Sequence, residues 1–164
     1  MILSLREDLV VFLTFCENAK EESKTLLNRA LTEYFRMKKV PPEEVVYLPS
    51  GKPAFCSGKT FLSVTHTEGL YAVCFSTKEV GIDGEKCDIV KERVAEKYFD
   101  QEEKALPFSL VWTGKEAVAK ITGEGLSAIS RIKVRRDQAF YHDKKYRLYE
   151  KEIRGYRITV AEKE

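Results

Sequence analysis

The last third of the chain constrains the fold most, because apolar and polar residues alternate there between turns. The apolar positions of this alternation are Ile132, Val134, Phe140, Tyr146, Leu148, Tyr156, Ile158 and Val160. Alternation with a period of two places successive side chains on opposite faces of a strand. Turns are expected at His142–Lys144 and near Gly155, which would join consecutive strands tightly. This part of the chain therefore predicts an antiparallel meander.

Helical periodicity occurs in the remaining two thirds. Helices are expected over Asn18–Lys38, Val90–Leu106 and roughly Ser109–Ile121. Pro41 and Pro42 follow the first helix and would stop it. We expect Ser109 to cap the start of the third helix and Gly123 to take the left-handed conformation after its end.

Short strands complete the pattern, and together with the helices they predict the α+β class. They are expected over Leu9–Phe15, Phe61–Thr65, Leu70–Ser76 and Val80–Glu85. The segment Leu48–Phe55 is too rich in proline and glycine for a regular element. If the chain has two lobes, they join near Thr77–Glu79, which gives an N-terminal lobe over residues 1–78 and a C-terminal lobe over residues 79–164.

Composition excludes several classes of protein. The 164 residues carry 28 Lys and Arg against 26 Asp and Glu, a balance that does not favour nucleic-acid binding. No apolar run reaches the ~20 residues of a membrane span, and the N-terminal segment lacks the pattern of a secretory signal. The four cysteines form no CxxC pair and have no zinc spacing with the histidines. We therefore expect a cytoplasmic protein with reduced thiols that binds neither nucleic acid nor membrane.

The first candidate for chemistry is the segment Val80-Gly81-Ile82-Asp83-Gly84-Glu85. On a strand, Asp83 and Glu85 point to one side while Ile82 points into the core. Adjacent carboxylates repel each other unless a cation lies between them, and a hard divalent cation such as Mg²⁺ suits their oxygens. The same triplet is also typical of a solvated strand end.

A second candidate lies on the expected third helix, where Trp112, Glu116 and Lys120 are spaced i, i+4 and i+8 and share one face. Glu116 and Lys120 could form an ordinary surface ion pair, or they could supply a metal ligand and a cation for phosphate. Thr65 and His66 follow an expected strand and could donate hydrogen bonds to a phosphate. A lone histidine in such a place is more often structural.

Taken in order, five segments resemble the 4'-phosphopantetheinyl transferase superfamily. They are Gly51-Lys52-Pro53-Ala54-Phe55, Leu62-Ser63-Val64-Thr65-His66-Thr67, Val80-Gly81-Ile82-Asp83-Gly84-Glu85, Tyr98-Phe99 with Glu102-Glu103, and Trp112-Thr113-Gly114-Lys115-Glu116-Ala117-Val118-Ala119-Lys120. The two-lobed, surfactin-synthetase-activating type is most similar, with a shortened N-terminal lobe. That resemblance implies two similar small lobes, each with an antiparallel sheet packed against a long helix.

The resemblance also implies a reaction of the holo-acyl-carrier-protein synthase type. The 4'-phosphopantetheine group of coenzyme A would move to a serine of an apo acyl or peptidyl carrier protein, releasing adenosine 3',5'-bisphosphate, with Mg²⁺ as cofactor. The implied metal ligands are Asp83, Glu85 and Glu116, and the implied catalytic residues are Asp83, Glu116 and Lys120. The implied coenzyme A ligands are Lys24, Gly51, Lys52, Pro53, Thr65, His66 and Lys120. Glu116 is the first candidate for the general base and Glu103 the second.

Some questions stay open at this level. The carrier could dock on the basic segment 131–157 or on an apolar edge formed by Val94, Tyr98 and Phe99. The protein could be a monomer or a homodimer. Two other functions fit less well: a non-catalytic module that binds coenzyme A or a carrier protein, and a Mg²⁺-dependent nucleotide hydrolase.

Overall fold

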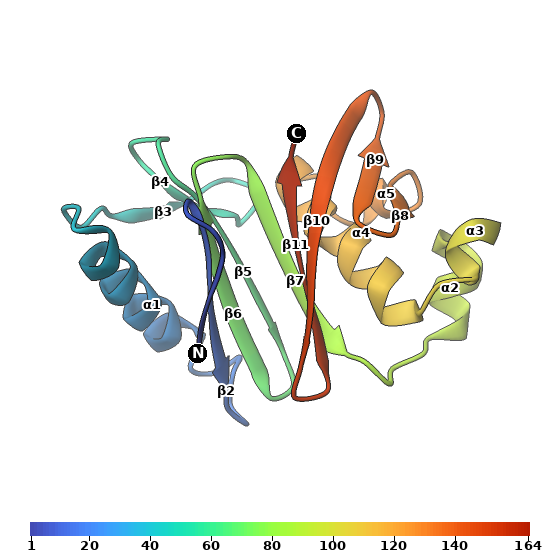
Figure 1. Cartoon of the computed structure of the whole chain (residues 1–164), viewed down its shortest axis with the longest axis horizontal. Helices are drawn as coiled ribbons and strands as arrows, with labels where there is room; N and C mark the ends of the chain where they lie inside the picture. Colours follow the sequence, from blue (N-terminus) through green and yellow to red (C-terminus); the bar gives the residue numbers. More distant parts are fainter.

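Two antiparallel sheets pack against each other, and a long helix covers the outer face of each (Figure 1). The computed structural model describes all 164 residues. The N-terminal sheet has the strand order β1 (Ile2–Arg6), β2 (Leu9–Phe15), β6 (Leu70–Ser76), β5 (Phe61–Thr67). The C-terminal sheet has the order β7 (Val80–Lys86), β11 (Tyr156–Lys163), β10 (Lys144–Ile153), β9 (Gln138–Tyr141), β8 (Lys133–Arg135). The α+β class is thereby confirmed, and so is the C-terminal meander.

The helices and one small hairpin complete the fold. The helices are α1 (Ser23–Lys38), α2 (Glu92–Tyr98), α3 (Gln101–Lys104), α4 (Phe108–Thr122) and α5 (Leu126–Ile129), and β3 (Val45–Tyr47) pairs with β4 (Pro53–Phe55). None of the helices combines the length and the apolar character needed to cross a bilayer. The proposed division into lobes at residue 78 stays a prediction, although each sheet draws its strands from one side of that position.

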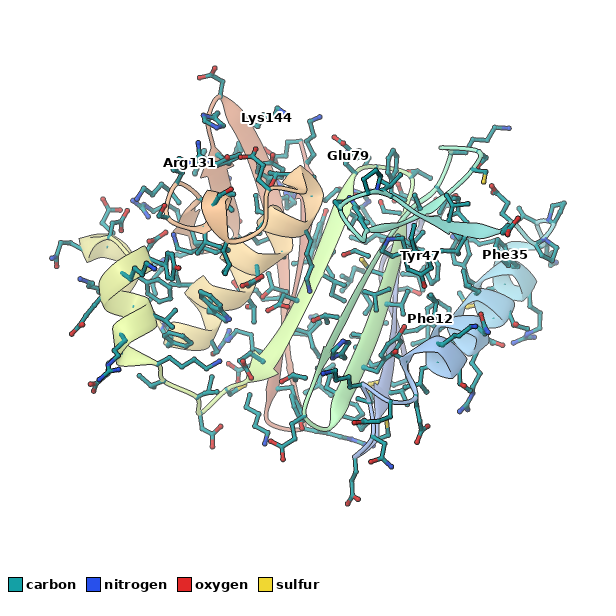
Figure 2. The ribbon with its side chains drawn as sticks, turned by 180° about the vertical axis from the view of Figure 1, so that it is seen from behind. Phe12, Phe35, Tyr47, Glu79, Arg131 and Lys144 are labelled. Carbon is teal, nitrogen blue, oxygen red and sulfur yellow. The ribbon has the colours of Figure 1, made fainter.

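The N-terminal sheet is buried on both faces, which explains why β2 is a continuous apolar run. Val10 and Phe12 belong to one buried cluster with residues of α1 such as Phe35, and Figure 2 labels both phenylalanines. Leu9 and Val11, at the intervening positions, pack in the core that lies between the two sheets. A strand covered on both faces loses the usual apolar–polar alternation.

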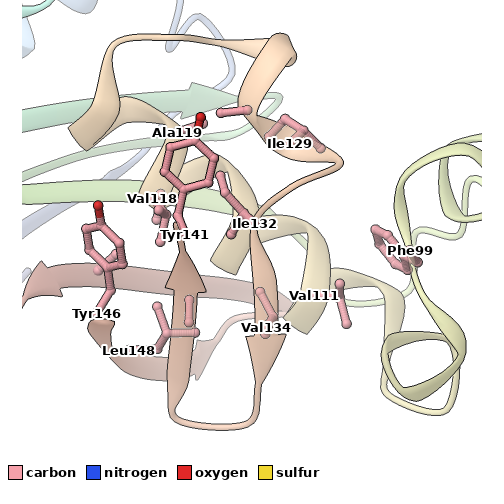
Figure 3. Close-up of a cluster of buried hydrophobic side chains, with 14 of the residues drawn as sticks. Phe99, Val111, Val118, Ala119, Ile129, Ile132, Val134, Tyr141, Tyr146 and Leu148 are labelled. Atoms are coloured by element: carbon pink, nitrogen blue, oxygen red, sulfur yellow. The ribbon is translucent and has the colours of Figure 1, made fainter. Parts of the chain in front are cut away.

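The C-terminal sheet is covered by α4 (Figure 3). Val111 and Val118 of α4 join the same buried cluster as Val134 and Tyr146 from the sheet. Trp112 is only partly buried and stacks on Phe108 with 6.1 Å between ring centroids.

The expected helix over Val90–Leu106 is wrong, because the chain leaves helical geometry at Phe99 and starts again after Asp100. The Asp100 carboxylate accepts a hydrogen bond from the Glu103 amide at 3.0 Å, and the Glu103 carboxylate accepts one from the Asp100 amide at 2.9 Å. This reciprocal capping box starts α3. The sequence signal was present, an Asp followed three residues later by a Glu.

Two further expectations, a helix cap at Ser109 and an irregular segment over Leu48–Phe55, need correction. Ser109 does not cap α4, since the helix begins at Phe108 and the Ser109 hydroxyl instead accepts a hydrogen bond from Arg157 Nε at 3.1 Å. Leu48–Phe55 is not wholly irregular, because Pro53 begins the short strand β4. Gly123 does take the left-handed conformation after α4, with φ of 73°.

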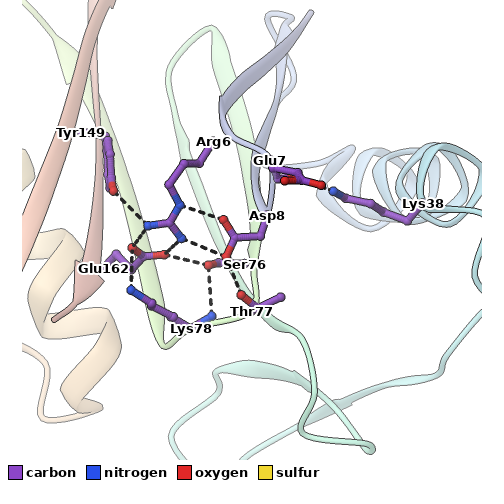
Figure 4. Close-up of polar contacts among 9 residues, drawn as sticks. All are labelled: Arg6, Glu7, Asp8, Lys38, Ser76, Thr77, Lys78, Tyr149 and Glu162. Carbon is purple, nitrogen blue, oxygen red and sulfur yellow. Dashed lines mark hydrogen bonds and ion pairs between the residues drawn. The ribbon is translucent and has the colours of Figure 1, made fainter.

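A polar clamp ties the two ends of the chain together (Figure 4). Arg6 of β1 donates two hydrogen bonds to the buried carboxylate of Glu162 in β11, at 2.7 and 2.9 Å. Ser76 donates to the same carboxylate at 2.9 Å, and Asp8 accepts two hydrogen bonds from the other side of the guanidinium. The Asp8 hydrogen bonds, followed by those to Glu162, raise the pKa of Arg6, so the guanidinium stays charged.

We expect Arg6→Ala to lower the free energy of unfolding by roughly 2–3 kcal/mol, because Glu162 would keep a buried charge without its main partner. This expected loss of unfolding free energy is smaller than the usual cost of breaking a buried ion pair, because the Arg6 side chain is partly exposed. Urea denaturation would measure the change. Arg36→Ala, which breaks an exposed i,i+3 pair with Glu33, is the matched control and should cost far less than Arg6→Ala. Equal losses in the two variants would contradict a clamp.

Candidate functional site

Helix α4 lies directly on β7, and this contact positions the candidate site. A side chain at Gly81 would overlap the carbonyl oxygen of Ala117, so only glycine permits the helix to approach so closely. Asp83 follows Gly81 by two residues and therefore points to the same face of β7. The glycine in the motif thus brings Asp83 to the side chains of α4.

Asp83 and Lys120 form the centre of the arrangement. Lys120 Nζ lies 2.9 Å from Asp83 Oδ1 and 2.7 Å from the carbonyl oxygen of Ile82. Asp83 is 9% exposed, whereas Ile82 is fully buried in the core between the sheets, as the alternation of β7 predicts. The ammonium group therefore neutralises a nearly buried carboxylate and satisfies a carbonyl at the edge of β7.

Glu116 lies one helical turn before Lys120 on α4 and faces a cleft. Burial raises the pKa of the Glu116 carboxyl group, and the nearby Asp83 charge raises it further, while Lys120 and Lys91 oppose the shift. A carboxyl group whose pKa is raised in this way is a better proton acceptor once ionised. The pattern of burial and like charge is typical of functional sites.

The cleft has a volume of about 270 Å³ and lies between α4 and the β3–β4 hairpin. It is lined by Ser50, Gly51, Lys52, Pro53, Ser63, Val64, Glu116, Ala119, Lys120, Gly123 and Gly125. A second cavity of about 400 Å³ adjoins it and shares Ser50, Lys52, Pro53 and Gly123. Two cations and one carboxylate from opposite sides of the cleft thus converge on a space large enough for part of a nucleotide-sized ligand.

Lys52 is the cation that the hairpin contributes. Burial lowers the pKa of its ammonium group, and the charge of Glu79, the residue just before β7, counteracts this shift. A partly desolvated ammonium group interacts more strongly with an anion than an exposed one does. Lys52 is therefore suited to bind phosphate at the hairpin side of the cleft.

The three carboxylates predicted to bind a metal do not come together as a cluster of three. Glu85 is turned toward Lys91, whose Nζ lies 3.4 Å from Glu85 Oε2. Asp83 and Glu116 are near enough to interact electrostatically. Because Mg²⁺ is usually held by one or two carboxylates, waters and substrate phosphates, this pair fits the ion, whereas Glu85 is held by a lysine.

The residues predicted for the 3'-phosphate are not gathered in the cleft. Thr65 is 5% exposed and donates a hydrogen bond to Asp83 Oδ1 at 3.0 Å. His66 is exposed, and its side chain points to the opposite side of β5 from that of Thr65. Lys24 is exposed in the first turn of α1. Neither His66 nor Lys24 lines the cleft.

Several lining residues were missed from the sequence. Ser63 lies between Leu62 and Val64 in an expected strand, and a polar residue in such a place often has a buried hydrogen-bond partner. The sequence predicts only a left-handed helix end at Gly123, yet Gly123 and Gly125 both line the cleft and Gly123 approaches Ser50 of the hairpin. No signal in the sequence pairs Ser50 with that turn.

Glu103, the second candidate for the general base, is excluded by its surroundings. Its side chain is fully buried and lies 2.9 Å from Nζ of Lys115, which is fully buried as well. Glu103 also accepts hydrogen bonds from the amides of Asp100 and Val134. A carboxylate enclosed in this way cannot reach a substrate.

Both candidate docking surfaces are weaker than expected. Phe99 is buried and stacks on Phe108, so only Val94 and Tyr98 of the expected apolar edge are partly exposed. Much of the positive charge of segment 131–157 is paired within the molecule, as for Arg135 with Asp100 and Arg157 with Glu150. The segment therefore presents less free positive charge than its composition indicates.

Comparison with known proteins identifies a family for the C-terminal half of the chain. A model of the 4'-phosphopantetheinyl transferase superfamily matches residues 79–161, a range that includes Asp83, Glu116 and Lys120. No curated protein shows significant similarity to the chain.

We expect Glu116→Gln to stabilise the metal-free protein at neutral pH. The pKa of Glu116 in the folded state lies above its ordinary value of 4.5. Between pH 4.5 and this raised pKa, the folded protein therefore binds more protons at Glu116 than the unfolded chain does. The free energy of unfolding falls as the pH rises through this range. Glutamine carries no charge, so it removes the cost of ionising a partly buried carboxyl group beside Asp83. Thermal unfolding with a chelator should show a midpoint roughly 1–3 °C higher for the variant at pH 7 and almost no difference at pH 4.

The control for that measurement is Glu96→Gln, which changes an exposed carboxylate on α2. Its midpoint should match that of the unchanged protein at both pH values. A Glu116→Gln variant that is less stable than the unchanged protein at pH 7 would show that the carboxylate is not under electrostatic strain.

Proposed function

The chain belongs to the 4'-phosphopantetheinyl transferase superfamily, and we propose that it transfers the 4'-phosphopantetheine group of coenzyme A to a serine of an apo acyl or peptidyl carrier protein. Adenosine 3',5'-bisphosphate would be the second product. The observation that carries the proposal is the convergence of Lys52, Glu116 and Lys120 on one cleft, with Asp83 hydrogen-bonded to Lys120.

The cleft is suited to the diphosphate of coenzyme A. Lys120 and Lys52 lie on opposite walls and supply two positive charges for the phosphate oxygens. The second cavity continues along the β3–β4 hairpin past Gly123 and would accept the adenine base, next to Gly51 and Pro53. Transfer of a phosphoryl-type group depends mainly on such positioning and charge neutralisation.

We propose Mg²⁺ as the cofactor, held by Asp83 and Glu116, with Glu85 as a third ligand only if its contact with Lys91 opens. When bound, the ion would neutralise phosphate charge and make the phosphorus more electrophilic. The raised pKa of Glu116 supports this proposal, because two neighbouring carboxylates with one ammonium group leave negative charge that a cation would balance.

The chemical step then needs a nucleophile and a proton acceptor. The serine hydroxyl of the carrier attacks the phosphorus that bears the pantetheine arm, and the bond from that phosphorus to the bridging oxygen breaks. The bridging oxygen leaves on the adenosine bisphosphate, and the serine proton passes to a base. Glu116 is the proposed base, because it faces the cleft and Glu103 is enclosed elsewhere. Lys120 would stabilise the charge on the leaving oxygen.

The 3'-phosphate site is assigned from the resemblance. We propose that His66 and Lys24 bind the 3'-phosphate from the α1 side of β5, where both are exposed. The proposed location is the cytoplasm, which the four unpaired cysteines support.

The direct test is incubation of an apo carrier protein with the purified protein, coenzyme A and Mg²⁺. The carrier should gain the mass of one phosphopantetheine group, and the gain should stop when a chelator is added. Binding of coenzyme A without any mass gain would favour a non-catalytic module. Release of inorganic phosphate in the absence of a carrier would favour a nucleotide hydrolase.

Glu116→Gln should reduce transfer by about 10²- to 10⁴-fold, since both a metal ligand and the proposed base are lost. Circular dichroism should show unchanged folding, because glutamine keeps the shape of the side chain. Transfer at the normal rate by a folded Glu116→Gln variant would contradict the assignment, and Glu96→Gln serves as the active control.

His66→Ala should weaken coenzyme A roughly tenfold or more while leaving dephospho-coenzyme A almost unaffected, because only the former carries the 3'-phosphate. Isothermal titration of both ligands measures the difference. His142→Asn, at the other histidine and in a turn with a φ of 51° that asparagine tolerates, is the control. Equal losses for the two ligands would remove His66 from the phosphate site.

A further inference from the structure

Three hydroxyl side chains of β5 face the edge of β7. Ser63, Thr65 and Thr67 occupy alternate positions, so they point to one side of the strand. Ser63 Oγ accepts a hydrogen bond from the amide of Ile82 at 3.1 Å, and Thr67 Oγ1 lies 3.5 Å from an oxygen of Glu85. The two strands belong to different sheets, so these side chains carry the polar contact between the sheets at the candidate site.

The central hydroxyl of this row contacts the candidate site directly. Thr65 Oγ1 donates to Asp83 Oδ1 at 3.0 Å, and the same oxygen accepts from Lys120 Nζ at 2.9 Å. Thr65 and Asp83 are both nearly excluded from solvent. Two donors on one oxygen fix the rotation of the carboxylate, and water has little room to replace the threonine hydroxyl.

The geometry also separates Thr65 from the residue beside it. His66 lies on the other face of β5 and is exposed, whereas the Thr65 hydroxyl is directed into the contact between β5 and β7. Side chains at adjacent strand positions point in opposite directions, so the Thr65 hydroxyl and the His66 ring face different sides of β5. The 3'-phosphate role that the resemblance implies for Thr65 conflicts with this arrangement.

We propose that Thr65 is a positioning residue: its hydroxyl orients Asp83, and through Asp83 it orients Lys120, while it makes no contact with the 3'-phosphate. The expected effect on the transfer rate rests on the proposed function, whereas the contact between Thr65 and Asp83 does not. It places on the N-terminal sheet a residue that orients a carboxylate of the C-terminal sheet and an ammonium group of α4.

The kinetic test compares Thr65→Val, which removes the hydroxyl and keeps the branched shape, with Thr65→Ser, which keeps the hydroxyl. Thr65→Val should lower kcat/KM for transfer about tenfold or more, by the same factor with coenzyme A and with dephospho-coenzyme A. Thr65→Ser should restore the rate to within about threefold of the unchanged protein. Thr67→Val, whose hydrogen bond is long and lies farther from Asp83, should lose less than Thr65→Val.

Three results would overturn the proposal. A loss confined to coenzyme A would identify Thr65 as a phosphate ligand. A Thr65→Ser variant as slow as Thr65→Val would show that the methyl group matters and not the hydroxyl. An unchanged rate for Thr65→Val would show that Asp83 needs no support from β5.

A second measurement does not depend on enzymatic activity. A double-mutant cycle with Thr65→Val and Asp83→Ala, followed by urea denaturation without ligand, measures the coupling of the two side chains. We expect a coupling of about fivefold or more in the unfolding equilibrium constant. Additive effects would overturn the proposal. Clear coupling in a protein that transfers no phosphopantetheine would sustain the contact with Asp83 and reject the proposed function alone.

Discussion

The close contact between α4 and β7 is the constraint on which the candidate site depends. At Gly81 the helix backbone occupies the space where a side chain would stand, and this approach brings Lys120 within hydrogen-bond distance of Asp83 and Ile82. A helix moved outward by the width of a methyl group would lengthen these contacts unless the Lys120 side chain changed its rotamer. The spacing between helix and sheet therefore sets the electrostatics of the cleft.

The position of α4 is reinforced by a buried ion pair on its other side. Lys115 is adjacent to Glu116 in the sequence, but its side chain points into the core, where it meets Glu103 and the backbone carbonyl of Ile129. Burial lowers the pKa of Lys115, and the Glu103 carboxylate opposes this shift. Such a pair is weak evidence for added stability, but removing one partner would leave the other charge buried. The helix thus presents one charge to the core and the next to the cleft.

The N-terminal sheet contributes to the site in two ways. The β3–β4 hairpin brings Lys52 to the cleft, and the hydroxyl groups of β5 meet the edge of β7. Because Ser63 accepts from the Ile82 amide while Lys120 donates to the Ile82 carbonyl, side chains replace the missing neighbouring strand at this edge. Polar backbone groups at a buried sheet edge need such partners. Binding groups from both sheets are consequently held in a fixed relation to one another.

Local sequence determined the elements and most of the candidate residues. The two-residue alternation of the C-terminal meander, the helical spacing of Glu116 and Lys120, and the glycine after α4 all depend on neighbours in the chain, and the structure confirms them. Only the tertiary structure decided which charges meet. Asp83 and Lys120 are 37 residues apart, and Thr65 is 18 residues from Asp83. It also decided that Glu103 is enclosed by Lys115 and that Glu85 turns to Lys91. These choices depend on how closely the helix and the two sheets pack. Gly81 permits a close approach to β7, but a residue pattern along one strand does not identify the element that makes it.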